Sequence, residues 1–295
     1  MLEVLPQLFI NGLITGSIYA IIATAFALTY SVTKFIDFAH AAIVLVAAYA
    51  FFSVSSSQFP VLGDSLFTAI LISIFTGAIV AVLLKNFVYR AFMNKKASKA
   101  VLFIVSIIVY FIAQALVQLA FGTDTKTIKG VEILPIEALG TVFSQIELGI
   151  IIAAIIFAGM LFAILKYTKI GKEMRAVADN YELAEIAGIN SKEVFLKTYF
   201  IAGLFASATG ITLGLERAIE PAMASTIMLR AITAAVIGGL GYIPGAIFGG
   251  YFLGMAESIM GFYMPSGFKD LFAFALLFAF LIFRPHGIFG KKGRV

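Results

Sequence analysis

Stretches of apolar residues alternate with short polar stretches along most of the chain. An α-helix needs about 20 apolar residues to cross a bilayer, and these stretches have that length. The pattern predicts an all-α polytopic membrane protein with about eight transmembrane helices, in a single domain over residues 1–295. Regular spans are expected near residues 8–32, 40–57, 65–88, 100–121, 146–167, 196–215 and 269–284.

The region at residues 227–260 departs from this regular pattern. It is short for two spans and long for one, and its middle, AVIGGLGYIPGAIFGG, holds glycines and a proline that interrupt a helix. One interpretation is a broken or re-entrant element whose half-helices meet near the membrane midplane and line a pathway. The other is a close contact between small-residue helices. We favour the broken element, with Gly239, Gly241 and Gly245 as candidate pathway residues.

The overall composition supports a membrane protein and excludes several kinds of site. Hydrophobic residues make up 61% of the chain and charged residues 13%, with a mean hydropathy of +1.04. A soluble chain of this size could not bury so much apolar surface. The chain has no cysteine, so disulfides and thiolate metal sites are excluded, and its two histidines stand apart, so no metal site is predicted.

The distribution of basic residues predicts the orientation of the chain in the membrane. Sixteen of the 21 lysines and arginines fall on one side of the alternating topology. Under the positive-inside rule this side is cytoplasmic, so the N-terminus is outside and the C-terminus inside. The same rule accounts for the net charge of +5 without a nucleic-acid partner. The start, MLEVLPQ, lacks a basic leader, so we expect the first apolar stretch to be a retained span.

Residues 168–199 form a charged island between two apolar stretches. Apolar positions recur there at helical spacing, Gly188 suits the end of a helix, and Asn190 with Glu193 resembles a capping box that begins the next helix. We therefore expect a short amphipathic helix, a turn and a new helix on the cytoplasmic side. It is interpreted as a docking element for a soluble partner, an interfacial helix or a plain linker.

Several polar residues lie in or beside the apolar stretches. Glu257 is a pathway candidate because an intramembrane carboxylate is costly, or else a hydrogen-bonded structural group. Asp37 and His40 flank the cytoplasmic end of the first span, where capping of the second span or gating is expected. Asn11 and Gln114 are further pathway candidates. Small residues spaced four apart also predict a close-packing face on the first span: Asn11, Gly12, Gly16 and Ala20.

Four motifs in order resemble a known family. They are INGLITGSIYAIIATAFALTYSVTKFIDFAH at 10–40, GKEMRAVADNYELAEIAGIN at 171–190, LRAITAAVIGGLGYIPGAIFGGYFLGMAES at 229–258 and FKDLFAFALLFAFLIFRPHGIFG at 268–290. With these motifs the chain resembles the permease subunits of ABC transporters for branched-chain amino acids, of the H type. The resemblance covers nearly the whole chain.

This resemblance implies a role for the charged island and a set of partners. In the family the island is the coupling helix, seated on a cytoplasmic ATPase, and the residues implied here are Arg175, Asp179, Glu182, Glu185, Gly188 and Asn190. The chain has no phosphate-binding GxxxxGK[ST] motif, so ATP and magnesium belong to that partner and no cofactor is expected in this chain. The implied assembly holds a second permease subunit, two ATPases and an extracytoplasmic binding protein in the cytoplasmic (inner) membrane.

The chain departs from the family pattern near the first span, so the substrate stays open. The family usually has Asn where Asp37 stands, and Gly-Glu where this chain has Ala41 and Ala42. Related permeases carry urea, short amides or other amino acids. A different class, an ion-coupled secondary transporter with Glu257 or Asp37 as the coupling carboxylate, is the further alternative.

Overall fold

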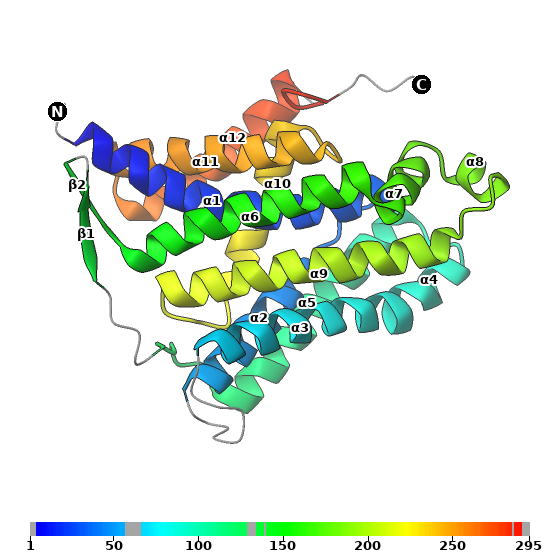
Figure 1. Cartoon of the computed structure of the whole chain (residues 1–295), viewed down its shortest axis with the longest axis horizontal. Helices are drawn as coiled ribbons and strands as arrows, with labels where there is room; N and C mark the ends of the chain where they lie inside the picture. Colours follow the sequence, from blue (N-terminus) through cyan, green and yellow to red (C-terminus); the bar gives the residue numbers. More distant parts are fainter. Residues whose placement is uncertain (1–3, 57–65, 129–133, 139, 285, 291–295) are drawn as a thin grey trace.

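The computed structural model describes residues 4–56, 66–128, 134–138, 140–284 and 286–290. Most of the described residues are helical, and a small antiparallel hairpin precedes α6 (Figure 1). The elements are α1 (Leu5–Thr33), α2 (His40–Ser55), α3 (Leu66–Leu83), a π-helical turn (Leu84–Tyr89), α4 (Arg90–Asn94), α5 (Lys99–Phe121), β1 (Pro135–Ala138), β2 (Thr141–Ser144), α6 (Gln145–Tyr167), α7 (Lys169–Asp179), α8 (Tyr181–Ile186), α9 (Ser191–Glu216), α10 (Met223–Gly238), α11 (Ile243–Tyr263), a 3₁₀ turn (Ser266–Phe268) and α12 (Lys269–Phe283).

Within the described residues, five helical segments are long and apolar enough to cross a membrane. They are α1, the continuous α3–α4 segment, α5, α6 and α9, and a sixth candidate arises if the bent pair α10–α11 counts as one span. The predicted number of about eight is therefore higher than the five or six that length and composition support. Helix α2 has 16 residues, which cover about 24 Å and so fall short of a full hydrocarbon core.

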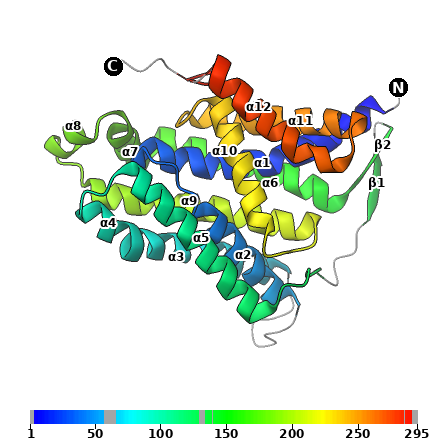
Figure 2. The same ribbon diagram turned by 180° about the vertical axis from the view of Figure 1, so that it is seen from behind.

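Helices α1 and α9 lie inside the bundle, and α3, α5 and α6 cover it (Figures 1 and 2). In the most apolar window of α1, 89% of the residues are buried, against 17% in α6. The inner helices carry buried serine, threonine and glycine, whereas the outer ones expose leucine, isoleucine and phenylalanine. The outer side chains suit lipid, whereas the inner polar ones find partners only within the protein.

The contact between α1 and α11 depends on glycines in both helices. A Cβ atom placed on Gly250 would lie 2.5 Å from the backbone nitrogen of Ala20, and one on Gly254 would lie 2.4 Å from the Cα of Gly16. Any side chain there would force the helices apart, since real Cβ atoms do not approach so closely. The predicted close-packing face of the first span is confirmed at Gly12, Gly16 and Ala20, whereas Asn11 is exposed, and the Gly-rich region supplies the partner of this face.

Helices α10 and α11 meet at an angle of 117°, as expected for a broken element. Gly239 and Gly241 in the turn have φ of 110° and 80°, which glycine adopts without strain. The expected midplane position of the turn is wrong, because Gly241 lines a groove together with Tyr30, at the end of α1, and Arg175 in α7. Helix α11 has 21 residues, about 31 Å, so it is not a half-helix.

The two ends of the bundle can be distinguished by what lies beside α1. At its start, the side chain of Gln7 donates to the carbonyl oxygen of Val142 at 3.0 Å and accepts from its N–H at 3.0 Å, which ties α1 to β2. At its other end lie α7 and the α10–α11 turn. We call these the hairpin end and the coupling end; a 29-residue helix separates them by about 43 Å (Figure 1).

Candidate functional site

A buried ion pair stands at the hairpin end, between three helices. The Nε of Arg230 in α10 donates to Oε1 of Glu257 in α11 at 3.0 Å, and the hydroxyl of Tyr19 in α1 donates to Oε2 at 2.6 Å. The Arg230 side chain is 13% exposed and that of Glu257 5% exposed. A second carboxylate, Asp270 in α12, accepts from Nη2 of Arg230 at 2.7 Å.

This arrangement satisfies both charges within the protein. The Arg230 guanidinium also lies 5.6 Å from the centre of the Tyr19 ring, a geometry for a cation–π contact. Because an unpaired charge at this depth would be costly, the partners hold Glu257 as a paired carboxylate. The geometry agrees with the hydrogen-bonded structural interpretation of Glu257.

The same carboxylate also borders a cavity. The cavity measures about 270 Å³, and its polar lining consists of Asn11, Thr15, Tyr19, Arg217, Arg230, Glu257, Ser258 and Lys269. Asn11 itself is exposed and accepts a hydrogen bond from the side chain of Gln7 at 3.0 Å. Two of the candidate pathway residues, Asn11 and Glu257, are therefore brought together, and a pathway role for them stays a prediction.

The other candidate pathway residues lie elsewhere. Gln114 lines a separate, mostly apolar cavity of about 450 Å³ between α5 and α10, with Phe38 and Leu229. Gly241 lines the groove of about 810 Å³ at the coupling end. Gly245 packs on the end of α10, where a Cβ atom would lie 2.3 Å from the carbonyl oxygen of Gly238.

Gly239 lies in the turn between α10 and α11 and packs against the C-terminal segment. A Cβ atom on Gly239 would lie 2.8 Å from the backbone nitrogen of Gly290. The six candidates are thus divided between the two ends of the bundle and the α5–α10 cavity, and they do not line one continuous cavity.

Asp37 is the centre of a second buried polar cluster. Its Oδ1 accepts from the Tyr89 hydroxyl and from the N–H of Ala39 at 3.0 Å, and its Oδ2 accepts from the Tyr199 hydroxyl at 2.8 Å. His40 lies beside it, with Nε2 3.1 Å from the hydroxyl oxygen of Thr29. The cluster joins α1, α2, the π-helical turn and α9.

The capping role expected at the start of the second span takes a different form. The N-cap position of α2 is Ala39, with no side-chain cap, and His40 is the first helical residue. Asp37 bonds the Ala39 N–H, but its other bonds go to two tyrosines. The π-helical turn that ends at Tyr89 aims this side chain at Asp37, so the carboxylate fastens three elements to one another.

The charged island forms two short helices at the coupling end. Thr168 caps α7, Asn180 caps α8, and Asn190 caps α9 by accepting from the N–H of Glu193 at 3.4 Å. The expected single helix is therefore split at Asn180, whose side chain starts a new one. Gly188 follows α8 with a φ of 83°, which agrees with the expected helix end.

The residues implied for coupling lie on the outside of these helices. Helix α7 buries Met174 and Val177, while the implied coupling residues that are exposed are Arg175, Asp179, Glu182, Glu185, Gly188 and Asn190. Helix α8 also exposes two large apolar side chains, Leu183 at 62% and Ile186 at 82%. Apolar side chains so exposed, beside charges, are typical of a surface that a protein partner covers.

Two groups at this end have shifted pKa values. Burial lowers the pKa of Lys34, and the neighbouring Lys99 adds to this effect, while Asp179 opposes it. Desolvation, with a hydrogen bond to Glu185, raises the pKa of Tyr181. The raised pKa keeps the Tyr181 hydroxyl neutral at neutral pH.

Several site residues were missed by the sequence reasoning. In the predicted topology Arg230 is one of the five basic residues on the outer side, and it interrupts an apolar run as Glu257 does. Tyr19, Tyr89 and Tyr199 gave no signal, because a tyrosine in a membrane helix is common and its partner lies far away in sequence.

Comparison with known proteins gives matches over almost the whole chain. Residues 8–281 match the family described as branched-chain amino acid transport system / permease component. The high-affinity branched-chain amino acid transport system permease protein LivH of Escherichia coli K12 is 29% identical, covering 97% of this chain and 96% of the relative. BraD of Pseudomonas aeruginosa, described in the same words, is 28% identical, with coverage of 97% and 95%.

One solved structure shares the fold. It is PsaBC from Streptococcus pneumoniae in complex with Fab, at 16% identity and a TM-score of 0.51, covering 95% of this chain and 92% of that chain. At this level of identity the likeness concerns the arrangement of the helices alone.

Proposed function

Because the chain belongs to the family of permease components of branched-chain amino acid transport systems, we propose that it forms the translocation path for branched-chain or related amino acids. As an ABC permease subunit it is a transport component and not an enzyme. The observation that carries the proposal is the match over residues 8–281, together with a helix pair, α7–α8, that presents charged and apolar side chains at one end of the bundle.

The proposed energy source is a pair of separate cytoplasmic ATPase subunits, which hold ATP and magnesium, and no cofactor is proposed in this chain. Helices α7 and α8 are the surface on which one ATPase is seated. Leu183 and Ile186 would pack into a hydrophobic groove of the ATPase, and Glu182 and Glu185 would pair with basic residues at the rim of that groove. Since α7 packs on α9 and on the end of α1, movement of the ATPase would reach the core of the bundle.

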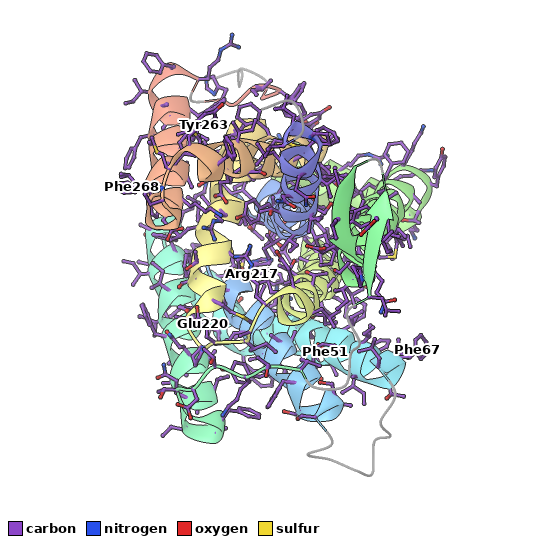
Figure 3. All side chains as sticks on the ribbon, turned by 90° about the vertical axis from the view of Figure 1, so that its left-hand side faces the viewer. Phe51, Phe67, Arg217, Glu220, Tyr263 and Phe268 are labelled. Atoms are coloured by element: carbon purple, nitrogen blue, oxygen red, sulfur yellow. The ribbon has the colours of Figure 1, made fainter. Side chains whose placement is uncertain are left out.

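The proposed orientation places the coupling end in the cytoplasm and the hairpin end outside the cytoplasmic membrane. The basic residues of the island support this orientation under the positive-inside rule. An extracytoplasmic binding protein would deliver substrate at the hairpin end. Figure 3 looks onto this end, where Phe67 and Phe268 lie at the periphery, with exposed fractions of 68% and 51%, as suits contact with lipid.

A second permease subunit, either the same chain or a paralogue, completes the proposed assembly. Urea or short amides remain the alternative substrates within the family. An ion-coupled transporter is less well supported, because Glu257 is paired with Arg230 and Asp37 with two tyrosines. A coupling carboxylate has to release and regain its ion during each cycle.

Uptake of labelled L-leucine tests the proposal. The chain would be expressed with its partner ATPase, binding protein and second permease subunit in cells that lack their own systems. Uptake should require a hydrolysis-competent ATPase and should survive collapse of the proton and sodium gradients. Uptake that follows those gradients without an ATPase would contradict the proposed function.

The proposed orientation is tested with the variant Asn180→Cys, since the chain has no cysteine of its own. An impermeant thiol reagent should not label this cysteine in intact cells.

A further inference from the structure

A second cavity adjoins the first at the hairpin end, and one atom of its lining residues lacks a hydrogen-bond partner. The cavity measures about 130 Å³ and lies between α1, the end of α9 and the start of α10. Glu216, at the end of α9, lines it, and its Oε2 is buried and accepts no hydrogen bond from the described residues. Its Oε1 accepts one from Arg217 at 3.3 Å. Figure 3 shows Arg217 and Glu220 on the link between α9 and α10.

A buried carboxylate oxygen without a donor is unfavourable, because it has lost its water and gained nothing in return. The charges nearby indicate which donor would suit it. The two cavities and their ion pairs hold four carboxylates, Glu216, Glu220, Glu257 and Asp270, against three basic groups, Arg217, Arg230 and Lys269. This surplus of negative charge favours a positively charged donor, such as a primary ammonium.

The rest of the cavity provides for the other parts of a ligand. The Arg217 side chain is 57% exposed and bonds Glu216 through one nitrogen, which leaves donors for a ligand carboxylate. Arg230, by contrast, is engaged by Glu257 and Asp270. The apolar wall consists of Ile18, Leu213, Met223 and Ile227. A volume of about 130 Å³ is roughly ten times the space of about 10–15 Å³ that a cavity needs to hold one water, which suits one small molecule.

We propose that this cavity binds a free aliphatic α-amino acid. Its ammonium donates to Oε2 of Glu216, its carboxylate accepts from Arg217, and its side chain packs on Ile18, Leu213 and Ile227. The inference rests on the proposed function and deepens it, since it gives the permease a substrate site of its own at the end where substrate arrives. It also separates the substrates, because urea and short amides have neither an ammonium nor a carboxylate.

The test is equilibrium binding of labelled L-leucine to the purified permease with its ATPase and permease partners, in nanodiscs and without the binding protein. Isoleucine and valine should compete. 4-Methylpentanoate, which lacks the ammonium, isoamylamine, which lacks the carboxylate, and urea should not. Glu216→Gln should weaken leucine binding at least tenfold. Glu137→Gln, an exposed carboxylate in the hairpin that does not line the cavity, should leave it unchanged.

A second variant guards against misfolding of the first. Met223→Phe fills the cavity from a partly exposed position and should also abolish binding. Absence of leucine binding by the wild-type complex, or equal binding by Glu216→Gln, overturns the proposed site.

ATP-driven uptake with the binding protein present distinguishes a failure of this site from a failure of the proposed function. If the wild type transports leucine but Glu216→Gln binds leucine as tightly as the wild type does, the site is wrong and the proposed function stands; if the wild type transports no amino acid, the proposed function fails.

Discussion

The Nε of Arg230 lies 3.0 Å from Oε1 of Glu257, and this pair joins α10 to α11 at a distance from the turn that connects them. The turn fixes one end of the bent pair through its glycines, and the ion pair fixes the other. Tyr19 in α1 donates a hydrogen bond to Glu257, and Asp270 in α12 accepts one from Arg230, so both of these helices contact the same pair. Four helices therefore meet at this guanidinium–carboxylate pair.

Removal of one partner of this pair should destabilise the protein strongly. Arg230→Met leaves Glu257 buried with the Tyr19 hydroxyl as its hydrogen-bond partner among the described residues, and the loss of a partner from a buried ion pair costs about 3–5 kcal/mol. The double variant Arg230→Met/Glu257→Met should recover part of that loss, since no buried charge is left unpaired and Asp270, at 61% exposure, stays in contact with solvent. Thermal unfolding of the purified permease in detergent measures both. A double variant that is no more stable than Arg230→Met would contradict the pairing.

The glycine contact between α1 and α11 should tolerate no side chain. Gly250→Ala places a Cβ atom 2.5 Å from the backbone of Ala20, so α1 and α11 must separate, and we expect a loss of folded protein. Gly159→Ala in α6 is the matched control, because its Cβ would meet nothing within 4 Å. Helix propensity alone then favours alanine by about 1 kcal/mol. The two variants are compared by the yield of monodisperse protein after membrane extraction. Equal yields of Gly250→Ala and Gly159→Ala would contradict the close contact.

The local features of the fold could be predicted from the sequence. The apolar runs predicted the outer helices, and the capping residue Asn190 and the helix-ending Gly188 predicted the ends of the helices around the island. The small residues of α1 predicted the face by which this helix packs on α11. Each of these depends on neighbours within a few positions, so one sequence carries the signal.

Contacts between distant residues could not be predicted in this way. Arg230 and Glu257 pair across 27 positions, and Asp37 and Tyr199 across 162, and nothing in a single sequence selects those partners. The π-helical turn before Arg90 changes which face of the helix meets Asp37, a shift that a regular helical period does not contain. The Gly/Pro run indicated a break, but its position in the membrane depends on the full length of α11.

The hydroxyl of Tyr199 should contribute to stability through Asp37. Tyr199→Phe removes a bond of 2.8 Å to a buried carboxylate, at a cost of about 1–2 kcal/mol. Tyr110→Phe is the matched control: both rings are buried, but the Tyr110 hydroxyl has no partner among the described residues, so its removal should be neutral or stabilising. Unfolding midpoints in detergent measure the difference, and an equal effect of the two variants would contradict the role given to Asp37.

The central claim is that α7 and α8 couple this permease to a separate ATPase, and a charge reversal on α8 tests it most directly. Glu182 and Glu185 are both exposed on α8. Glu182→Lys/Glu185→Lys would cost under about 0.5 kcal/mol on a free surface, whereas like charges at an interface cost several kcal/mol.

The measurement is co-purification of the ATPase together with ATP-driven L-leucine uptake in the same membranes. The reversed variant should reach the membrane at the normal level and lose both the bound ATPase and the uptake. The charge-preserving control, Glu182→Asp/Glu185→Asp, should keep both. If the reversed variant retains the ATPase and the transport rate of the wild type, α8 is not the coupling element and the account is contradicted.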